Sequence, residues 1–225
     1  VRPLMYSSMT DVIAGQGTIG LEILEQLPDV DVVVVPIGGG GLIAGVAYTI
    51  KQINPNCKVY GVQAAGAPSM KNSVADGKIE TLKNVQTIAD GIAVKTPGTN
   101  TFELIKKYVD GIYTVSDDEI ALAILTLMEQ QKLVSEGAGA VPVAAVMNGK
   151  IPDIEGKKVC CLVSGGNIDV TILSRVIERG LKMGGRSASI TIALSDKPGQ
   201  LLGVSKIVAD NGANVVSVNY IVCNT

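Results

Sequence analysis

The stretch "VVVVPIGGGGLIAG" at residues 32–45 is the most informative part of the sequence, because a β-branched run leads into four consecutive glycines and then back to apolar residues. Residues 30–37 are continuously apolar, which is typical of a strand buried on both faces of a parallel sheet. Residues 42–53 have the apolar spacing of a helix and stop before Pro55. A glycine turn between strand and helix exposes main-chain N–H groups where the helix dipole favours an anion. The stretch therefore predicts an anion-binding strand–loop–helix unit.

The spacing of the glycines narrows the kind of anion. The loop does not have the G-x-G-x-x-G spacing of a dinucleotide site, and Gln63 ends the next expected strand (residues 58–63) where an acidic residue would bind a ribose. No G-K-[ST] follows the loop, so it is not a Walker loop. We expect one terminal phosphate held by main-chain amides; a tight turn for close helix–strand packing is the alternative interpretation.

The rest of the chain to residue 182 alternates strand-like and helix-like segments. Ser116 and Glu119 form a capping box, in which each side chain accepts a hydrogen bond from the other residue's main-chain N–H. The alternation predicts an α/β fold with a mostly parallel sheet and helices on both faces. The other expected elements are loops at 79–98, a helix at 116–132, a small-residue helix at 135–146, a strand at 158–163 ending in "SGGN", and a helix at 168–182.

The pattern changes after residues 183–187, "MGGRS", which are expected to form a linker. Residues 188–194 alternate like a half-exposed strand, residues 201–210 are amphipathic, and residues 214–222 are again strand-like. These segments predict a β-α-β unit. Three elements cannot bury a core alone, so we expect this unit to be truncated or to be completed by another chain.

Composition excludes several kinds of function. The chain has no histidine, which removes Ser-His-Asp relays, H-E-x-x-H metal sites and zinc deaminase sites. An enzyme with this sequence must move protons with a lysine, a carboxylate or a cofactor. A net charge of -2 and an aromatic content of 3% provide neither the charge nor the stacking surface for nucleic acid.

Composition also bears on the compartment. No apolar run approaches the roughly 18 residues needed to cross a bilayer, and the N-terminus has no signal-peptide pattern. The cysteines are interpreted as reduced core thiols, since the adjacent Cys160 and Cys161 would point to opposite faces of a strand. Cys57 and Cys223 are interpreted in the same way. We therefore expect a cytoplasmic protein.

Five motifs occur in one order: "DVIAGQGTIGLEI" (11–23), "PIGGGGLIAG" (36–45), "TIADGIAVKTPG" (87–98), "SEGAGAVPVAA" (135–145) and "VSGGN" (163–167). In these motifs the chain resembles the threonine dehydratase (threonine ammonia-lyase) family over about residues 11–183. The members of that family are pyridoxal-phosphate enzymes of the tryptophan-synthase-β-like fold, also called fold type II. The tail at residues 196–218 resembles the first half of an ACT domain, a module that binds amino acids as regulators.

The resemblance implies a role for each matching position. Ser164 would hydrogen-bond the pyridine nitrogen, Glu136 would lie beside the ring, and the Asp90-Gly91 loop would approach the cofactor. The implied cofactor-binding residues are Gly38, Gly39, Gly40, Gly41, Leu42, Gly91, Glu136 and Ser164, the first five through their main-chain amides to the phosphate. A serine hydroxyl cannot hold the ring nitrogen as a pyridinium, so the ring is a weaker electron sink and β-elimination is favoured. The implied reaction converts threonine to 2-oxobutanoate and ammonia.

The chain departs from the family in several places, and residues 1–10, "VRPLMYSSMT", do not match the family's segment before "DVIAGQG". The S-x-K-x-R-G motif that carries the Schiff-base lysine and the S-x-G-N-H substrate loop are both absent. We therefore expect the catalytic region (residues 1–183) to lack its N-terminal portion and to be inactive alone, and we expect a truncated ACT-like domain at 184–225. Gln63 and Ser69 stand where serine racemases of this fold place carboxylate ligands, which predicts that no divalent metal binds here.

Two alternatives to threonine dehydratase remain. One is a serine dehydratase or racemase of the same fold, although the ACT-like tail favours threonine. The other is a non-catalytic amino-acid-binding regulatory protein. For regulation, the candidate effector contacts are Pro198, Gly199 and Asn214, with a plain β-turn as the alternative interpretation, and ACT modules usually pair across subunits, so a homo-oligomer is expected.

Overall fold

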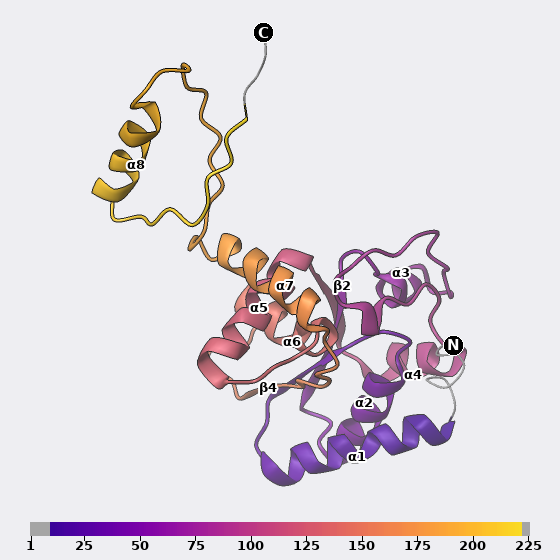
Figure 1. Cartoon of the computed structure of the whole chain (residues 1–225). Helices are drawn as coiled ribbons and strands as arrows, with labels where there is room; N and C mark the ends of the chain where they lie inside the picture. Colours follow the sequence, from indigo (N-terminus) through magenta and orange to yellow (C-terminus); the bar gives the residue numbers. More distant parts are fainter. Residues whose placement is uncertain (1–9, 222–225) are drawn as a thin grey trace. The chain divides into compact units, whose positions relative to one another are not determined.

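The computed structural model of the chain describes residues 10–221. The chain divides into two compact units after Ser187, the last residue of the stretch expected to be a linker. The first unit contains a four-stranded sheet and the helices that cover it, and the second contains one helix and two extended segments (Figure 1).

All strand pairs of the sheet are parallel, and the strand order is β3-β2-β1-β4. The central strand β1 places Val34 opposite Tyr60 of β2 and opposite Cys161 of β4. The α/β fold with a parallel sheet is therefore confirmed. The strands are β1 (Val32–Pro36), β2 (Lys58–Ala64), β3 (Gly111–Val115) and β4 (Val159–Cys161).

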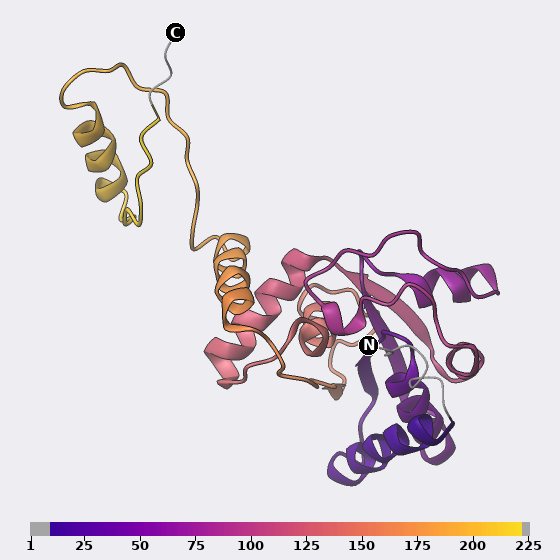
Figure 2. The ribbon, with the colours of Figure 1, turned by 45° about the vertical axis from the view of Figure 1, so that its right-hand side comes forward.

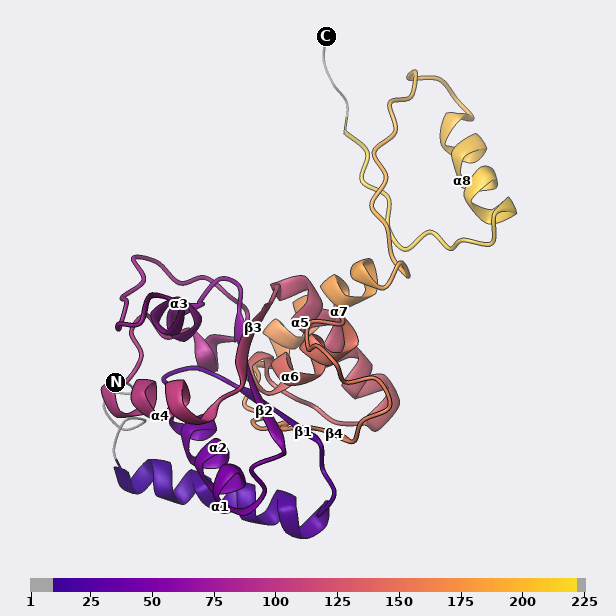
Figure 3. The ribbon, with the colours of Figure 1, turned by 180° about the vertical axis from the view of Figure 1, so that it is seen from behind.

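Helices cover both faces of the sheet, as predicted. Helices α1, α2 and α4 pack on one face, and α5, α6 and α7 pack on the other (Figure 3). The helices of this unit are α1 (Thr10–Gln26), α2 (Gly41–Ile53), α3 (Ser69–Asp76), α4 (Thr99–Tyr108), α5 (Asp117–Thr126), α6 (Gly137–Met147) and α7 (Val170–Met183), with a 3-10 turn η1 (Asp90–Ile92) and a π-helical turn η2 (Leu127–Gln131).

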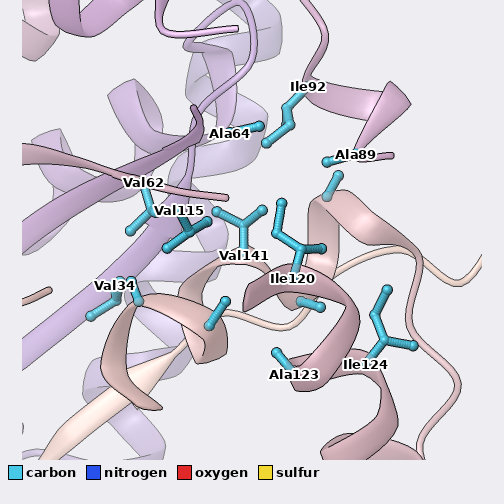
Figure 4. Close-up of a cluster of buried hydrophobic side chains, with 14 of the residues drawn as sticks. Val34, Val62, Ala64, Ala89, Ile92, Val115, Ile120, Ala123, Ile124 and Val141 are labelled. Carbon is cyan, nitrogen blue, oxygen red and sulfur yellow. The ribbon is translucent and has the colours of Figure 1, made fainter. Parts of the chain in front are cut away.

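The β1 valines divide between two hydrophobic clusters because successive side chains of a strand point to opposite faces. Val32 and Val34 belong to the cluster on the α5–α6 face, whose centre is drawn in Figure 4, and Val33 and Val35 belong to the cluster beneath α1 and α2. Cys160 and Cys161 also pack on opposite faces and are free thiols. Burial raises the pKa of the Cys161 thiol to about 12.

The other cysteines were also expected to be reduced core thiols. Cys57 is free and buried, as expected, and burial raises the pKa of its thiol to about 11. Cys223 lies outside the described residues.

The capping box at the start of α5 is confirmed. The Glu119 N–H donates to Ser116 Oγ at 3.3 Å, and the Ser116 N–H donates to Glu119 Oε2 at 2.7 Å. The expected helix 116–132 is correct only in part, because the α-helical hydrogen bonds end at Thr126 and a π-helical turn follows. Lys132 then adopts a left-handed conformation, with φ of 58°, and the chain leaves the helix toward α6.

The second unit contains helix α8 (Gln200–Asp210) at the expected position. The strands expected at 188–194 and 214–222 are wrong for the residues that the structure describes, because residues 188–194 and 214–221 are extended without pairing into a ladder (Figure 2). A strand is held by a hydrogen-bonded neighbour and a buried face. All residues of both segments are exposed, and α8 buries none of its residues, so burial stabilises neither segment.

The amino ends of the strands are joined by charged side chains. Asp110, just before β3, accepts the Val59 N–H at 2.8 Å and pairs with Lys51 at 2.7 Å and Lys58 at 3.0 Å. Asp31, just before β1, accepts the Lys158 N–H at 2.8 Å. Main-chain N–H groups at this edge are therefore bound by carboxylates of neighbouring strands.

Candidate active site

A cavity of about 230 Å³ lies at the carboxyl end of β1, where ligands bind in open α/β sheets. Its walls come from four separate stretches: the β1–α2 loop, the η1 turn, the start of α6 and the end of the segment after β4. The lining residues are Pro36, Gly38, Gly39, Gly40, Gly41, Leu42, Gly91, Ile92, Glu136, Ala138 and Ser164. All eight residues predicted to bind a cofactor thus lie at one cavity, together with Pro36, Ile92 and Ala138, which the sequence motifs did not single out.

Neighbouring residues leave little room for side chains on the glycine loop. Gly40 caps α2 with φ of 95°, a conformation that favours glycine. A Cβ there would lie 2.8 Å from both Ile105 Cδ1 and Met70 Cε. A Cβ on Gly38 would lie 3.2 Å from the main chain of Ile92. Glycine is therefore strongly favoured at position 40, and position 38 leaves little room for a side chain beside the η1 turn.

Hydrogen bonds hold the loop carbonyl groups and leave the amides free. Gly39 O accepts from the Thr101 hydroxyl at 2.7 Å, and Gly40 O accepts from the Ala44 N–H at 3.0 Å. Within the part of the chain that the structure describes, the amides of residues 38–42 donate to no protein acceptor. Helix α2 also leaves its first-turn amides without intrahelical partners. Consecutive free N–H groups at a helix N-terminus fit a phosphate.

Thr101 is a supporting residue that the motifs did not reveal. It lies 62 residues after Gly39, in the first turn of α4, and is buried. Its hydroxyl also lies 2.9 Å from Gly98 O. No local pattern in the sequence connects a threonine of one helix to the carbonyl of a distant loop.

Glu136 lies between the start of α6 and the "SGGN" loop. Its N–H donates to Gly165 O at 3.1 Å, and its Oε2 accepts the Asn167 N–H at 3.2 Å. The buried Ser135 hydroxyl donates to Glu136 O at 3.0 Å. These bonds hold the Glu136 carboxylate and the half-buried Ser164 in the same part of the cavity wall.

The two positions considered for a divalent metal are both fully buried. The Gln63 amide bridges two main-chain groups: its Nε2 donates to Ile37 O at 3.3 Å, and its Oε1 accepts the Lys71 N–H at 2.8 Å. Within residues 10–221, the Ser69 hydroxyl has no hydrogen-bond partner. Among residues 10–221, no group of three or more acidic or cysteine side chains could hold a metal ion.

The predicted effector residues belong to the second unit. Gly199 caps α8 with φ of 91°, and Pro198 precedes it. Asn214 lies on the extended segment after α8, and all three residues are exposed. Their role in binding an effector remains a prediction.

Comparison with known protein families identifies the class of protein to which the chain belongs. The family model described as "Pyridoxal-phosphate dependent enzyme" matches residues 4–165. The chain belongs to this family.

Particular relatives are threonine and serine enzymes. The chain is 58% identical over 207 residues to an L-threonine ammonia-lyase of Thermotoga maritima, covering 92% of this chain and 51% of that protein. A processed threonine deaminase isoform 2 from Solanum lycopersicum has a TM-score of 0.71 at 41% identity, covering 76% of this chain and 50% of that one. A serine racemase from Dictyostelium discoideum has a TM-score of 0.67 at 38% identity, covering 72% and 52% respectively. The chain thus spans about half the length of the curated relatives it matches. No helix in the described part of the chain is long and apolar enough to cross a membrane.

Proposed function

We propose that this chain binds the phosphate and ring of pyridoxal phosphate in an enzyme that converts threonine to 2-oxobutanoate and ammonia by β-elimination. The observation that carries the proposal is the cavity in which the glycine loop, Glu136 and Ser164 meet. The loop supports the proposal, because the amides of residues 38–42 donate to no acceptor within the described chain, and a Cβ on Gly38 or Gly40 would lie within 3.2 Å of neighbouring residues.

In this proposal each wall of the cavity has a separate task. The amides of residues 38–42 hold the phosphate, and Thr101 orients them by binding the Gly39 carbonyl on the opposite side. The Ser164 hydroxyl, which lines the cavity, would donate to the ring nitrogen of a bound cofactor. When bound, pyridoxal phosphate supplies the electron sink for loss of the α-proton and the β-hydroxyl of the substrate. The Glu136 carboxylate, which accepts the Asn167 N–H, would lie beside the ring of a bound cofactor.

A titration with pyridoxal phosphate tests the binding half of the proposal. We expect a saturable absorbance or fluorescence change that inorganic phosphate suppresses by competing for the glycine loop. Replacing Ser164 with Ala should raise the Kd several-fold, because one hydrogen bond contributes roughly 1 kcal/mol. Ser174→Ala, on the exposed surface of α7, is the matched control and should leave the Kd unchanged. No binding by the wild-type chain would overturn the proposal.

A second experiment tests the need for a Schiff-base lysine. Because the S-x-K-x-R-G motif does not occur in these 225 residues, the chain incubated with pyridoxal phosphate and threonine should yield no 2-oxobutanoate. Robust turnover by the purified chain would contradict this. The sequence encoded upstream of Val1 is a further test: finding the lysine motif there supports the enzyme, and its absence supports a non-catalytic binding protein.

A serine dehydratase or racemase is the second candidate, supported by the similarity to the serine racemase from Dictyostelium discoideum. The two candidates differ in their products. A protein that contains the lysine motif and this chain should form 2-oxobutanoate faster from L-threonine than pyruvate or D-serine from L-serine. The reverse order would favour the second candidate.

We further propose that the protein is cytoplasmic, forms homo-oligomers and responds to an amino acid through Pro198, Gly199 and Asn214. Calorimetric titration with isoleucine, valine and threonine tests the last point. The absence of heat with all three would reject an effector role for this segment.

A further inference from the structure

Residues 87–92 form the cavity wall that carries Gly91 and Ile92, and the segment is confined on two sides. On one side a Cβ on Gly38 would lie 3.2 Å from Ile92 Cα and 3.5 Å from Gly91 O. On the other side a Cβ on Gly137, at the start of α6, would lie 2.8 Å from Ala89 Cα. A displacement of residues 87–92 would therefore bring them into steric contact with the glycine loop or with the start of α6.

A third contact holds the segment at its beginning. Asp117, the first residue of α5, accepts a hydrogen bond from the Thr87 hydroxyl at 2.6 Å and from the Ile88 N–H at 3.2 Å, both at Oδ1. The Thr87 hydroxyl oxygen in turn accepts the Ala89 N–H at 3.1 Å. One carboxylate oxygen thus orders three consecutive residues immediately before η1.

The other main-chain hydrogen bonds in this part of the wall are local. The Ile92 N–H donates to Ala89 O, and the Ala93 N–H donates to Asp90 O, each at 3.1 Å. Such bonds give the turn its shape but do not attach it to the sheet or to a helix. The buried side chains of Ala89 and Ile92 add apolar contacts with the cluster that includes Ile120 of α5 (Figure 4).

Bonds to an ionised group are roughly twice as strong as neutral ones, and the N-terminus of α5 favours a carboxylate at Asp117. We propose that Asp117, acting through Thr87, is a positioning residue that holds the 88–92 wall against the cofactor cavity. Asp117 does not line the cavity itself. The link to pyridoxal phosphate rests on the proposed function, whereas the positioning of the wall can be measured without any ligand.

Four variants of the chain separate positioning from general stability. Asp117→Ala removes the acceptor, and Thr87→Val removes the hydroxyl at nearly constant volume. Asp117→Asn keeps an oxygen at the Oδ1 position and serves as the conservative rescue. Asp118→Ala is the matched control, because it removes a carboxylate from the same turn of α5 whose partner is Arg179 of α7.

Amide hydrogen exchange of residues 88–94 is the first measurement. We expect Asp117→Ala and Thr87→Val to increase exchange about tenfold in this segment, with exchange in β1 and β2 unchanged, and Asp117→Asn to restore most of the protection. Asp118→Ala should leave the segment as in the wild type. Equal exchange in Asp117→Ala and Asp118→Ala would overturn the proposal.

The pyridoxal-phosphate Kd is the second measurement. It should rise roughly tenfold in Asp117→Ala and Thr87→Val, and stay within about twofold of wild type in Asp117→Asn and Asp118→Ala. A Kd that follows the thermal midpoint instead of local exchange would show a merely structural role and contradict the proposal. If the wild-type chain binds no pyridoxal phosphate, the proposed function fails, and the exchange comparison alone decides the role of Asp117.

Discussion

The two edges of the sheet differ in how their main-chain groups are used. At the amino edge, carboxylates of Asp31 and Asp110 bind main-chain N–H groups of neighbouring strands, and two lysines pair with Asp110. At the carboxyl edge, four consecutive glycines carry no side chains, and the amides of residues 38–42 have no acceptor within the described chain. At the amino edge, protein carboxylates accept hydrogen bonds from the main-chain N–H groups. At the carboxyl edge, the amides of residues 38–42 have no acceptor within the described chain and can donate to a ligand.

The difference indicates that the amino edge of the sheet contributes mainly to folding stability and the carboxyl edge mainly to ligand binding. Unpaired main-chain donors cost free energy when they are buried, so an edge that keeps them free must be stabilised elsewhere. Thr101 and the residues packed behind Gly40 supply rigidity to the open edge without using its amides. We therefore expect changes at the carboxyl edge to affect binding and changes at the amino edge to affect stability alone.

The largest effect is expected for Gly40→Ala. The left-handed φ of 95° and the predicted clash with Ile105 and Met70 should lower the free energy of unfolding by about 2–4 kcal/mol and abolish detectable pyridoxal-phosphate binding. Titration and urea unfolding measure both. The control is Gly77→Ala, which has φ of 71° but no neighbours within 4 Å, and should cost only about 1–2 kcal/mol. A wild-type affinity in Gly40→Ala would contradict the proposal that the glycine loop at the carboxyl edge binds the cofactor phosphate.

Asp110→Ala should have the next largest effect. It leaves Lys51, which is mostly buried, without its carboxylate and removes the acceptor of the Val59 N–H, so the free energy of unfolding should fall by about 2–3 kcal/mol. Urea unfolding measures this loss. The Kd for pyridoxal phosphate should not change, because Asp110 lies at the opposite edge of the sheet. A weaker affinity in the folded variant would show that the two edges are coupled.

The pH dependence of the free energy of unfolding provides a second measure of the contribution of Asp110. Burial opposes ionisation of Asp110, but the hydrogen bonds from Lys51, the Val59 amide and Lys58 together hold its pKa below the ordinary value. Its stabilisation is therefore complete above the unfolded pKa of about 4 and is lost as the pH falls through the lower folded-state pKa. The free energy of unfolding of the wild type should decline below about pH 4 more steeply than that of Asp110→Asn.

The smallest effect is expected for Arg179→Ala. Its ion pair with Asp118 joins α7 to α5, but the two side chains are 43% and 40% exposed. Exposed pairs contribute about 0–1 kcal/mol, and thermal unfolding should detect little change. If Arg179→Ala lost as much folding stability as Asp110→Ala, an exposed ion pair between helices would be as important as the carboxylates at the strand ends.

The predictable parts of the fold are those with short-range patterns. The glycine loop, the capping box at Ser116 and the two-faced burial of β1 follow from residues within about one helical turn or strand of each other. The helices α1, α3 and α4 and the short edge strand β3 were not predicted. The weak patterns and half-buried surfaces of β3, α3 and α4 leave little local signal. The strands expected in 188–194 and 214–221 were wrong because alternation in sequence does not supply a pairing partner.

The same distinction applies to the candidate site. The glycine loop between a buried strand and a helix could be recognised from the residues alone, because the conformations it needs are local properties of glycine and of helix N-termini, whereas its binding of an anion stays a prediction. The bonds from Thr101 to the Gly39 carbonyl and from Thr87 and Ile88 to Asp117 became visible only in the folded chain. Those bonds join residues that are 62 and about 30 positions apart, and their partners are set by how helices pack on the sheet.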